Sequence, residues 1–451
     1  MTYSFSTTPN RRIIKQAGFA LLEAGSVRAK NTKNILIKNL MDGCLGALVW
    51  YFIGYHLAYG TKDSCKGGSD CNGFVGNGAD VFMNKAAELA PLGNAGSGHY
   101  YAGWMFQWAF AAAASTIVSG AVAERCKFGA YLAYTAALTG VIYPVVVNWG
   151  WSAHGWLSPW VLAADGETAV EPYLGANGMI DFAGSGIVHM TGGVAALVGA
   201  IFLGPRTGRF SPSGECIDMP GHSSVLVALG TFILWFGWYG FNPVSTLAFE
   251  YMETAARVAV TTTLGAAAGG VTALSIHYGF TKSLDVGPMC NGILAGLVSI
   301  TGNCVVIEPW AAALIGAIGA AIYYGFSALL RKLKIDDPLD ASSVHGACGA
   351  WGVIAAGLFA KQKYVLNDYG AEGGADDYGA LYGGGGKQLG NQIAGVVAII
   401  AWVGFTSSVL FGVLKYAGML RVPVEEEEVG LDTSHHGGNA YNFEKELDSK
   451  A

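Results

Sequence analysis

Long apolar stretches separated by short polar loops dominate the chain. A helix needs about 20 apolar residues to cross the roughly 30 Å of hydrocarbon in a bilayer, and ten stretches meet that requirement. They lie at approximately 35–60, 98–123, 128–151, 182–204, 223–245, 257–280, 288–307, 309–331, 345–361 and 390–417. The pattern predicts an all-α, polytopic membrane protein with little room for a soluble domain.

The composition agrees with this prediction. Charged residues make up 13% of the chain, whereas an ordinary soluble domain carries about 25%. The 66 glycines include the GxxxG spacings Gly265–Gly269 and Gly292–Gly296 within apolar stretches. Small residues at this spacing let helix backbones approach closely in lipid, so we expect tight helix packing at these two sites.

The first apolar segment, Ile13–Ala24, is too short to cross a bilayer straight. Arg11, Arg12 and Lys15 occupy positions where a complete span needs apolar residues, and the segment lacks the apolar core of a signal peptide. We therefore interpret it as the inner half of a span, with residues 1–15 replacing the outer half. The function of the whole chain then depends on whether it tolerates this truncated first span.

Basic residues are concentrated in alternate loops. They are Arg28, Lys30, Lys33, Arg125, Lys127, Arg206, Arg209, Lys282, Arg331, Lys332 and Lys334, whereas loop 152–181 has no lysine or arginine. By the positive-inside rule the basic loops face the cytoplasm. The tail at 418–451 then also lies inside, and its acidic run Glu425–Glu428 precedes a glycine-rich, aromatic segment that is interpreted as a docking segment.

Several classes of protein and site receive no support. The net charge is −6 and no dense basic cluster is present, so we expect no nucleic-acid partner. Cofactor motifs, metal-ligand clusters and a nucleophile beside a base are absent from the sequence, which argues against an enzyme. Cys65 and Cys71 lie close together in a polar loop, where a disulfide and two free thiols are both open alternatives.

Two histidines stand in matching sequence contexts. Asp181–His189 reads DFAGSGIVH and Asp337–His345 reads DPLDASSVH, so each histidine follows an aspartate by eight residues and precedes small residues and an apolar run. Transporters often contain inverted halves with the binding site between them. We predict inverted five-helix halves at 13–204 and 223–361, a last span at 390–417, and His189 and His345 together at the pseudo-two-fold axis.

The alternative is two unrelated histidines, each hydrogen-bonded to a neighbouring helix. Ionisable residues within spans are by default candidates for function, and the matching context favours a pair. A metal site is disfavoured, because zinc sites use three or four protein ligands.

Aromatic residues and one hydroxyl suit a small cation at the outer mouth. Trp151 lies at the outer end of one span, Phe110 lies in another, and Phe241 precedes Ser245 by one turn. Aromatic faces attract cations, although interfacial tryptophans alone usually form the aromatic belt of a membrane protein.

The motifs GFALLEAGSVRAKNTKNILIKN, DFAGSGIVHMTGG, GWYGFNPVS, DDPLDASSVHGACGAWG and GLDTSHHGGNAY resemble the ammonium transporter (Amt/Mep/Rh) family, in particular its plant- and alga-like Amt branch. The resemblance covers about Gln16 to Tyr441. It implies an eleven-span plasma-membrane protein, 13–417, which forms homotrimers with one pore per subunit, followed by a cytoplasmic regulatory tail at 418–451.

The resemblance also implies roles for individual residues. Phe110, Trp151 and Ser245 would recruit ammonium, Asp181 would support its binding and deprotonation, Phe110 and Phe241 would form a gate, and His189 and His345 would line the pore. In the tail, Thr433 or Ser434 would accept phosphate from a kinase and so release the tail.

Ammonium transport follows as the expected function, with no cofactor. A bare cation suffers a large desolvation penalty in a dry pore, so ammonia would pass the narrow part while the two imidazoles relay the proton separately. We expect net charge transfer equivalent to the ammonium ion. The rival interpretation is an ammonium sensor with the same fold and little conduction.

Overall fold

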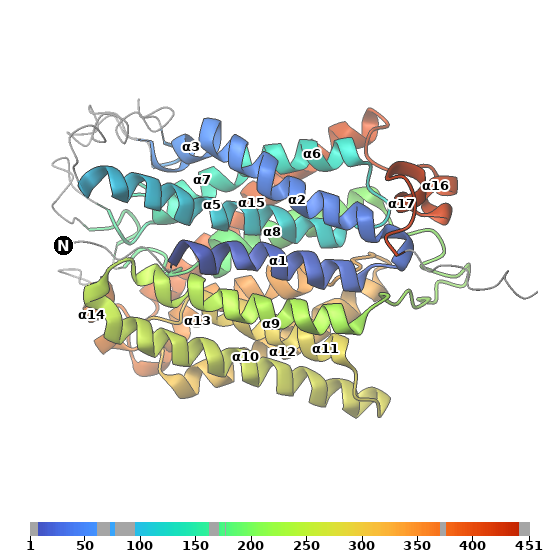
Figure 1. Ribbon diagram of the computed structural model, residues 1–451. Helices are drawn as coiled ribbons and strands as arrows, with labels where there is room; N and C mark the ends of the chain where they lie inside the picture. The colour runs from blue at the N-terminus through green and yellow to red at the C-terminus, as the bar shows by residue number, and fades with distance from the viewer. Residues whose placement is uncertain are drawn as a thin grey trace, which may run out of the picture.

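The computed structural model describes residues 8–60, 73–76, 95–161, 171–175, 177–369 and 376–441, apart from the side chains of 8–13 and 95–100. In this part of the chain the regular structure is helical, with two isolated β-bridges as the exception. The long helices run side by side along a common direction (Figure 1). Cys65 and Cys71 lie outside the described residues.

The long helices coincide with the ten predicted spans. Their bounds are α2 Thr32–Val49, α5 Ala95–Ala121, α6 Phe128–Ala137 continued by α7 Tyr143–Trp151, α8 Thr191–Leu203, α9 Ser224–Phe241, α10 Met252–Thr281, α11 Val286–Thr301, α12 Pro309–Lys332, α13 Cys348–Phe359 and α15 Lys387–Tyr416. Within the described residues, eight helical segments are long and apolar enough to cross a membrane.

Shorter elements complete the described chain. They are α1 Thr8–Ser26, α3 Tyr55–Tyr59, α14 Gln362–Tyr369, α16 Val424–Val429 and α17 Leu431–His435, the π-helical turns η2 Trp50–Gly54, η6 Leu138–Ile142, η7 Ser185–Met190 and η10 Ser342–Ala347, and the 3-10 turns η1 Ala29–Asn31, η8 Pro243–Thr246, η9 Phe249–Tyr251 and η11 Ala380–Tyr382. The sequence pattern predicted none of the π-helical turns.

The first helix is longer than predicted. It has 19 residues and begins at Thr8, five residues before the expected start, which corresponds to about 28 Å at 1.5 Å per residue. It is not one of the eight segments that are both long and apolar enough to span, because its outer part is charged. It packs along α9, where Gly18 and Gly230 leave no room for a Cβ between the two backbones.

Helix α11 ends earlier than predicted. The predicted span reached residue 307, but the helix ends at Thr301. The Gly302 N–H donates to Ser185 Oγ at 2.6 Å and the Gly302 carbonyl accepts from Phe182 N at 2.9 Å. These bonds to Phe182 and to Ser185, the first residue of η7, replace the helical ones, so the chain turns here.

The two histidine segments run in opposite directions, as an inverted repeat requires. The η7–α8 helix ends next to Arg206, whose backbone N–H donates to Asp336 Oδ2 at 2.9 Å, and Asp336 immediately precedes the η10–α13 segment. One segment therefore ends where the other begins. Both start with a π-helical turn that contains the histidine.

The two GxxxG motifs pack against each other. A Cβ on Gly269 of α10 would lie 2.3 Å from the carbonyl oxygen of Gly292 in α11, and a Cβ on Gly296 would lie 2.2 Å from the carbonyl oxygen of Gly265. The backbones are thus too close for any larger side chain, which confirms the prediction of tight packing at both motifs.

Four of the basic loops meet at one end of the bundle, hereafter the basic end. Arg28 pairs with Glu124 at 2.5 Å, and Asp336 pairs with Arg206 at 2.8 Å and Arg209 at 3.2 Å. Burial favours the neutral carboxyl, but the hydrogen bonds and positive charge of the neighbouring arginines outweigh it and lower the pKa of Asp336 to about 2.

The tail docks on the same end, where α16 and α17 lie beside the start of α2 (Figure 1). The Asp432 carboxylate accepts hydrogen bonds from the backbone N–H groups of Lys33 at 2.9 Å and Asn34 at 2.8 Å. Glu427 accepts from Thr207 N at 2.7 Å and pairs with Arg421 at 2.8 Å. These contacts support the interpretation of the tail as a docking segment.

Candidate functional site

His189 and His345 lie in contact at the centre of the bundle. Their Nδ1 atoms are 3.1 Å apart, and the rings are stacked at a centroid distance of 5.2 Å and an interplanar angle of 14°. His189 is fully buried and His345 is 5% exposed. A single proton shared between the two Nδ1 atoms makes one imidazole a donor and the other an acceptor, so the predicted pair is present in the structure.

Close backbone crossing brings the two histidines together. A Cβ on Gly193 would lie 2.0 Å from Gly346 N, and a Cβ on Gly349 would lie 2.5 Å from Ser185 O. The glycines that follow each histidine therefore let the two antiparallel segments touch. This explains why small residues stand after both histidines in the repeat.

Two further aromatic residues contact the pair, and neither was predicted. The Trp238 ring stacks on His189 at 5.1 Å and 10°, and its Nε1 donates to Thr301 Oγ1 at 2.8 Å. Phe19 of α1 lies 6.1 Å from the His345 ring. Trp238 lies in the GWYGFNPV motif only three residues before Phe241. This position was the one feature of the sequence that could have identified Trp238 as a site residue.

Phe110 and Phe241 pack against each other on the side of the histidine pair away from the basic end. Their rings lie 4.3 Å apart in an edge-to-face arrangement, and both are fully buried. Phe110 comes from α5 and Phe241 from the last residue of α9. The two rings that the resemblance assigned to a gate are therefore in contact.

Trp151 lies against the outer side of Phe110. Its ring centroid is 5.2 Å from that of Phe110, and its Nε1 donates to the Asp181 carbonyl at 2.8 Å. Trp149 points elsewhere, because its Nε1 donates to Phe74 O at 2.9 Å. Of these two tryptophans, Trp151 is thus the one that adjoins the phenylalanine pair.

Ser245 follows Phe241 by one turn. Its hydroxyl donates to the Phe241 carbonyl at 2.6 Å, which uses its only hydrogen. The oxygen lone pairs remain available as acceptors, as a bound cation with N–H donors would require.

Asp181 shapes the turn that carries His189. Its Oδ2 accepts hydrogen bonds from the backbone N–H groups of Gly186 at 3.0 Å and Ile187 at 2.7 Å. Its Oδ1 accepts no hydrogen bond from the described residues. Asp181 therefore caps η7 with one carboxylate oxygen, and its other oxygen faces Gly302, where an added Cβ would lie 2.6 Å from it.

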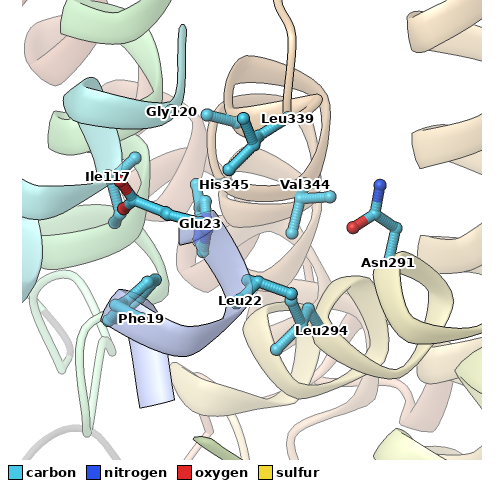
Figure 2. Close-up of a pocket in the computed structure, with 11 residues that line it drawn as sticks. Phe19, Leu22, Glu23, Ile117, Gly120, Asn291, Leu294, Leu339, Val344 and His345 are labelled. Carbon is cyan, nitrogen blue, oxygen red and sulfur yellow. The ribbon is translucent and has the colours of Figure 1, made fainter. Parts of the chain in front are cut away.

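A small cavity adjoins His345 on the side towards the basic end. It has a volume of about 20 Å³ and is lined by Phe19, Leu22, Glu23, Leu294, Leu339 and His345, among others. Figure 2 shows Glu23 and His345 on its wall among apolar side chains. A cavity of this size holds about one water molecule, so a small solute leaving the histidines enters a narrow, mostly apolar space.

Glu23 is the one acidic residue in this wall. Its carboxylate accepts hydrogen bonds from Asn39 Nδ2 at 3.0 Å and from the Ser119 hydroxyl. The sequence pattern did not single it out, because it reads as part of the EAG motif of the first segment. Glu23 thus contributes polar atoms to a wall that is otherwise mostly apolar.

Taken in order, the site consists of Trp151, the two phenylalanines, the two histidines and the inner cavity. No cluster of metal-binding residues occurs among the described residues. A row of buried aromatic side chains that leads to a pair of stacked imidazoles, within a bundle of membrane-spanning helices, is typical of a membrane transporter of a small solute.

The comparisons with known proteins agree. The profile of the Ammonium Transporter Family matches residues 12–441, and the chain belongs to that family. It is 46% identical to ammonium transporter 1 member 1 of Oryza sativa subsp. japonica over 442 residues, covering 94% of this chain and 82% of the relative. It is 44% identical to the Arabidopsis thaliana protein of the same name, covering 94% and 81%.

Solved structures show the same fold. A protein described as "Sensor Amt Protein" matches with a TM-score of 0.81 and 33% identity, covering 95% of this chain and 96% of that chain. Saccharomyces cerevisiae Mep2 matches with a TM-score of 0.75 and 26% identity, covering 93% and 86%. The predicted polytopic fold of this family is therefore confirmed.

Proposed function

We propose that this chain transports ammonium across a membrane through the path between Trp151 and the inner cavity. The observation that carries the proposal is the buried contact between His189 and His345, whose Nδ1 atoms are 3.1 Å apart. Two adjacent imidazoles can pass a proton while a neutral ammonia molecule moves along their ring edges. Membership of the ammonium transporter family supports this substrate.

The recruitment step takes place at the outer mouth. Trp151 and Phe110 offer aromatic faces and Ser245 offers an acceptor oxygen, which together suit a small cation with N–H donors. Asp181 adds negative charge beside this site. Deprotonation follows there, because a bare cation cannot enter the dry segment beyond the phenylalanine gate without a large desolvation penalty.

The conduction step takes place at the two histidines. Ammonia passes the gate and moves past the two imidazoles, and the proton crosses separately through the Nδ1–Nδ1 contact. Together, the movements of the ammonia molecule and the proton transfer the equivalent of one ammonium ion with its charge. Glu23 and the inner cavity receive the solute at the exit.

The test is ammonium-dependent current in proteoliposomes that contain wild-type or variant protein. We expect His189→Ala and His345→Ala each to abolish the current, since either change breaks the proton relay. The control is His277→Ala, because His277 lies on α10, where its Nδ1 is 3.4 Å from the hydroxyl oxygen of Tyr324. Unchanged current in both pore variants would contradict the relay.

A second candidate function is ammonium sensing with little conduction. The similarity to the protein described as "Sensor Amt Protein" and the tail docked on the basic end favour it. The same liposomes separate the two, because a sensor binds ammonium but supports no ammonium-dependent current or uptake in any variant.

Assembly, location and regulation complete the proposal. We infer a homotrimer in the plasma membrane with the basic end and the tail in the cytoplasm, consistent with the positive-inside rule. Thr433 and Ser434 are exposed on the docked tail and are accessible to a kinase. A phosphate there adds about −1.5 to −2 charge close to Asp432 and weakens docking by repulsion.

A further inference from the structure

The side chain of Lys15 reaches from α1 to two aromatic rings of the site. Lys15 is only 1% exposed, and its Nζ lies 3.4 Å from the ring centroids of both Trp238 and Phe241. At this distance the amine is in van der Waals contact with both rings. No further small molecule fits between the amine and either ring.

These two rings fix where the amine lies along the path. Phe241 is one half of the gate, and Trp238 stacks on His189. The amine therefore occupies the stretch between the gate and the histidine pair, which is the stretch that ammonia must cross.

Tight packing of α1 on α9 holds the side chain in this place. A Cβ on Gly237 would lie 2.7 Å from Lys15 Cγ, so the lysine stem crosses α9 at a position where a glycine leaves room for it. One turn further along, the backbones of Gly18 and Gly230 touch and set the register of the two helices. The amine is thus positioned by two helix backbones and not by a mobile loop.

We propose that the Lys15 ε-amino group is a tethered analogue of the substrate that occupies the ammonia path below the gate and limits flux through this chain. A primary ammonium carries the same kind of N–H donors and the same attraction to aromatic faces as an ammonium ion. When charged, it repels an arriving cation and a migrating proton. When neutral, it still fills the volume that an ammonia molecule needs.

The inference rests on the proposed transport function and adds a flux-limiting residue to it.

The test compares ammonium uptake and current in proteoliposomes with wild type, Lys15→Met, Lys15→Ala and Lys15→Arg. Methionine keeps the length of the stem and removes the charge and the donors. We expect flux to rise roughly tenfold in Lys15→Met, a factor that corresponds to a barrier lower by about 1.4 kcal/mol, and to stay at the wild-type level in Lys15→Arg.

The matched control is Lys363→Met. Lys363 is an exposed lysine of α14, at the end of the bundle opposite the tail, so its replacement removes a positive charge without touching the path. We expect wild-type flux. Lys15→Ala removes the amine without adding any group. If Lys15→Met does not elute from size exclusion as folded protein, the flux through Lys15→Ala tests the role of Lys15 instead.

The outcomes separate the two proposals. Wild-type or lower flux in folded Lys15→Met and Lys15→Ala proteins, in the presence of measurable wild-type flux, overturns the role of Lys15 alone. Absence of flux from wild type and all variants, each eluting as folded protein, overturns the proposed transport function together with this inference.

Discussion

At the scale of single residues, an aspartate caps the turn that carries each of the two stacked histidines. The Asp181 carboxylate accepts from the N–H groups of Gly186 and Ile187, and the Asp337 carboxylate accepts from those of Ala341 and Ser342. Each aspartate thus holds the start of a π-helical turn whose later part carries a histidine. These bonds reach five and six residues ahead of Asp181 and four and five residues ahead of Asp337, so the two segments share the capping aspartate but not the exact register of its bonds.

Two substitutions of Asp181 separate its capping role from its charge. In Asp181→Ala two buried N–H groups lose their acceptor, at a cost of about 1–3 kcal/mol each, so we expect both lower thermal stability in detergent and loss of ammonium uptake. In Asp181→Asn the amide oxygen can still accept, so we expect near wild-type stability but uptake reduced by about tenfold, equivalent to about 1.4 kcal/mol in the barrier. Wild-type uptake by the folded asparagine variant would show that the charge is not needed.

The sequence predicted the site residues to which a repeat or the family resemblance gave a role, and it missed those whose contacts arise only from helix packing. The histidine pair followed from two matching segments, whereas Trp238 and Lys15 meet only because α1 packs on α9. The spacing of apolar and polar residues along the chain does not indicate which two helices will be in contact. Lys15 was noticed only as a charge that interrupts a span, and its position on the path is a property of the packing.

At the scale of helices, hydrophobic length predicted the number and order of the spans but not their ends. Helix α11 stops at Thr301 although the apolar pattern continues to Ile307, because Gly302 forms hydrogen bonds with Phe182 and Ser185. Residues 303–307 are buried without being helical. An apolar run indicates that the residues are buried. Where the helix ends within that run depends on tertiary hydrogen bonds.

The GxxxG contact gives a prediction for helix packing. In Gly269→Leu the side chain would meet the backbones of Gly292 and Gly296, so α10 and α11 must separate, and we expect a loss of stability of about 3 kcal/mol or more, at the upper end for overpacking. The control is Gly279→Leu in the same helix, where a Cβ meets nothing within 4 Å. Thermal unfolding in detergent measures both, and equal unfolding temperatures would contradict tight packing at this crossing.

At the scale of the whole molecule, buried ion pairs join loops that are far apart in the sequence. Glu124 and Asp336 are almost completely buried, and between them they pair with Arg28, Arg206 and Arg209. The count of basic residues predicted that these loops share one side. It did not predict that arginines such as Arg206 are buried there, because burial depends on the acidic partners that the fold brings to them.

Asp336 gives a pH-dependent test of this ionic cluster. Its pKa of about 2 lies below the ordinary 3.8, so its contribution to stability, about 2 kcal/mol at about 1.4 kcal/mol per pKa unit, is present above pH 4 and lost as the pH falls from about 4 to 2. Asp336→Asn leaves Arg206 without its charged partner, so we expect a loss of about 3–5 kcal/mol at pH 7 and a smaller further loss in acid than in wild type.

Unfolding temperatures in detergent between pH 7 and pH 2.5 measure both effects, provided that wild type and variant are compared at each pH. The control is Asp218→Asn, because Asp218 is an exposed acid in the same loop as Arg206, and its loss should leave the whole curve unchanged. If Asp336→Asn and wild type lost stability in parallel below pH 4, the acid sensitivity of the basic end would have to come from another carboxylate. Glu124 would be the next to test, since it is the other buried acid that pairs with Arg206.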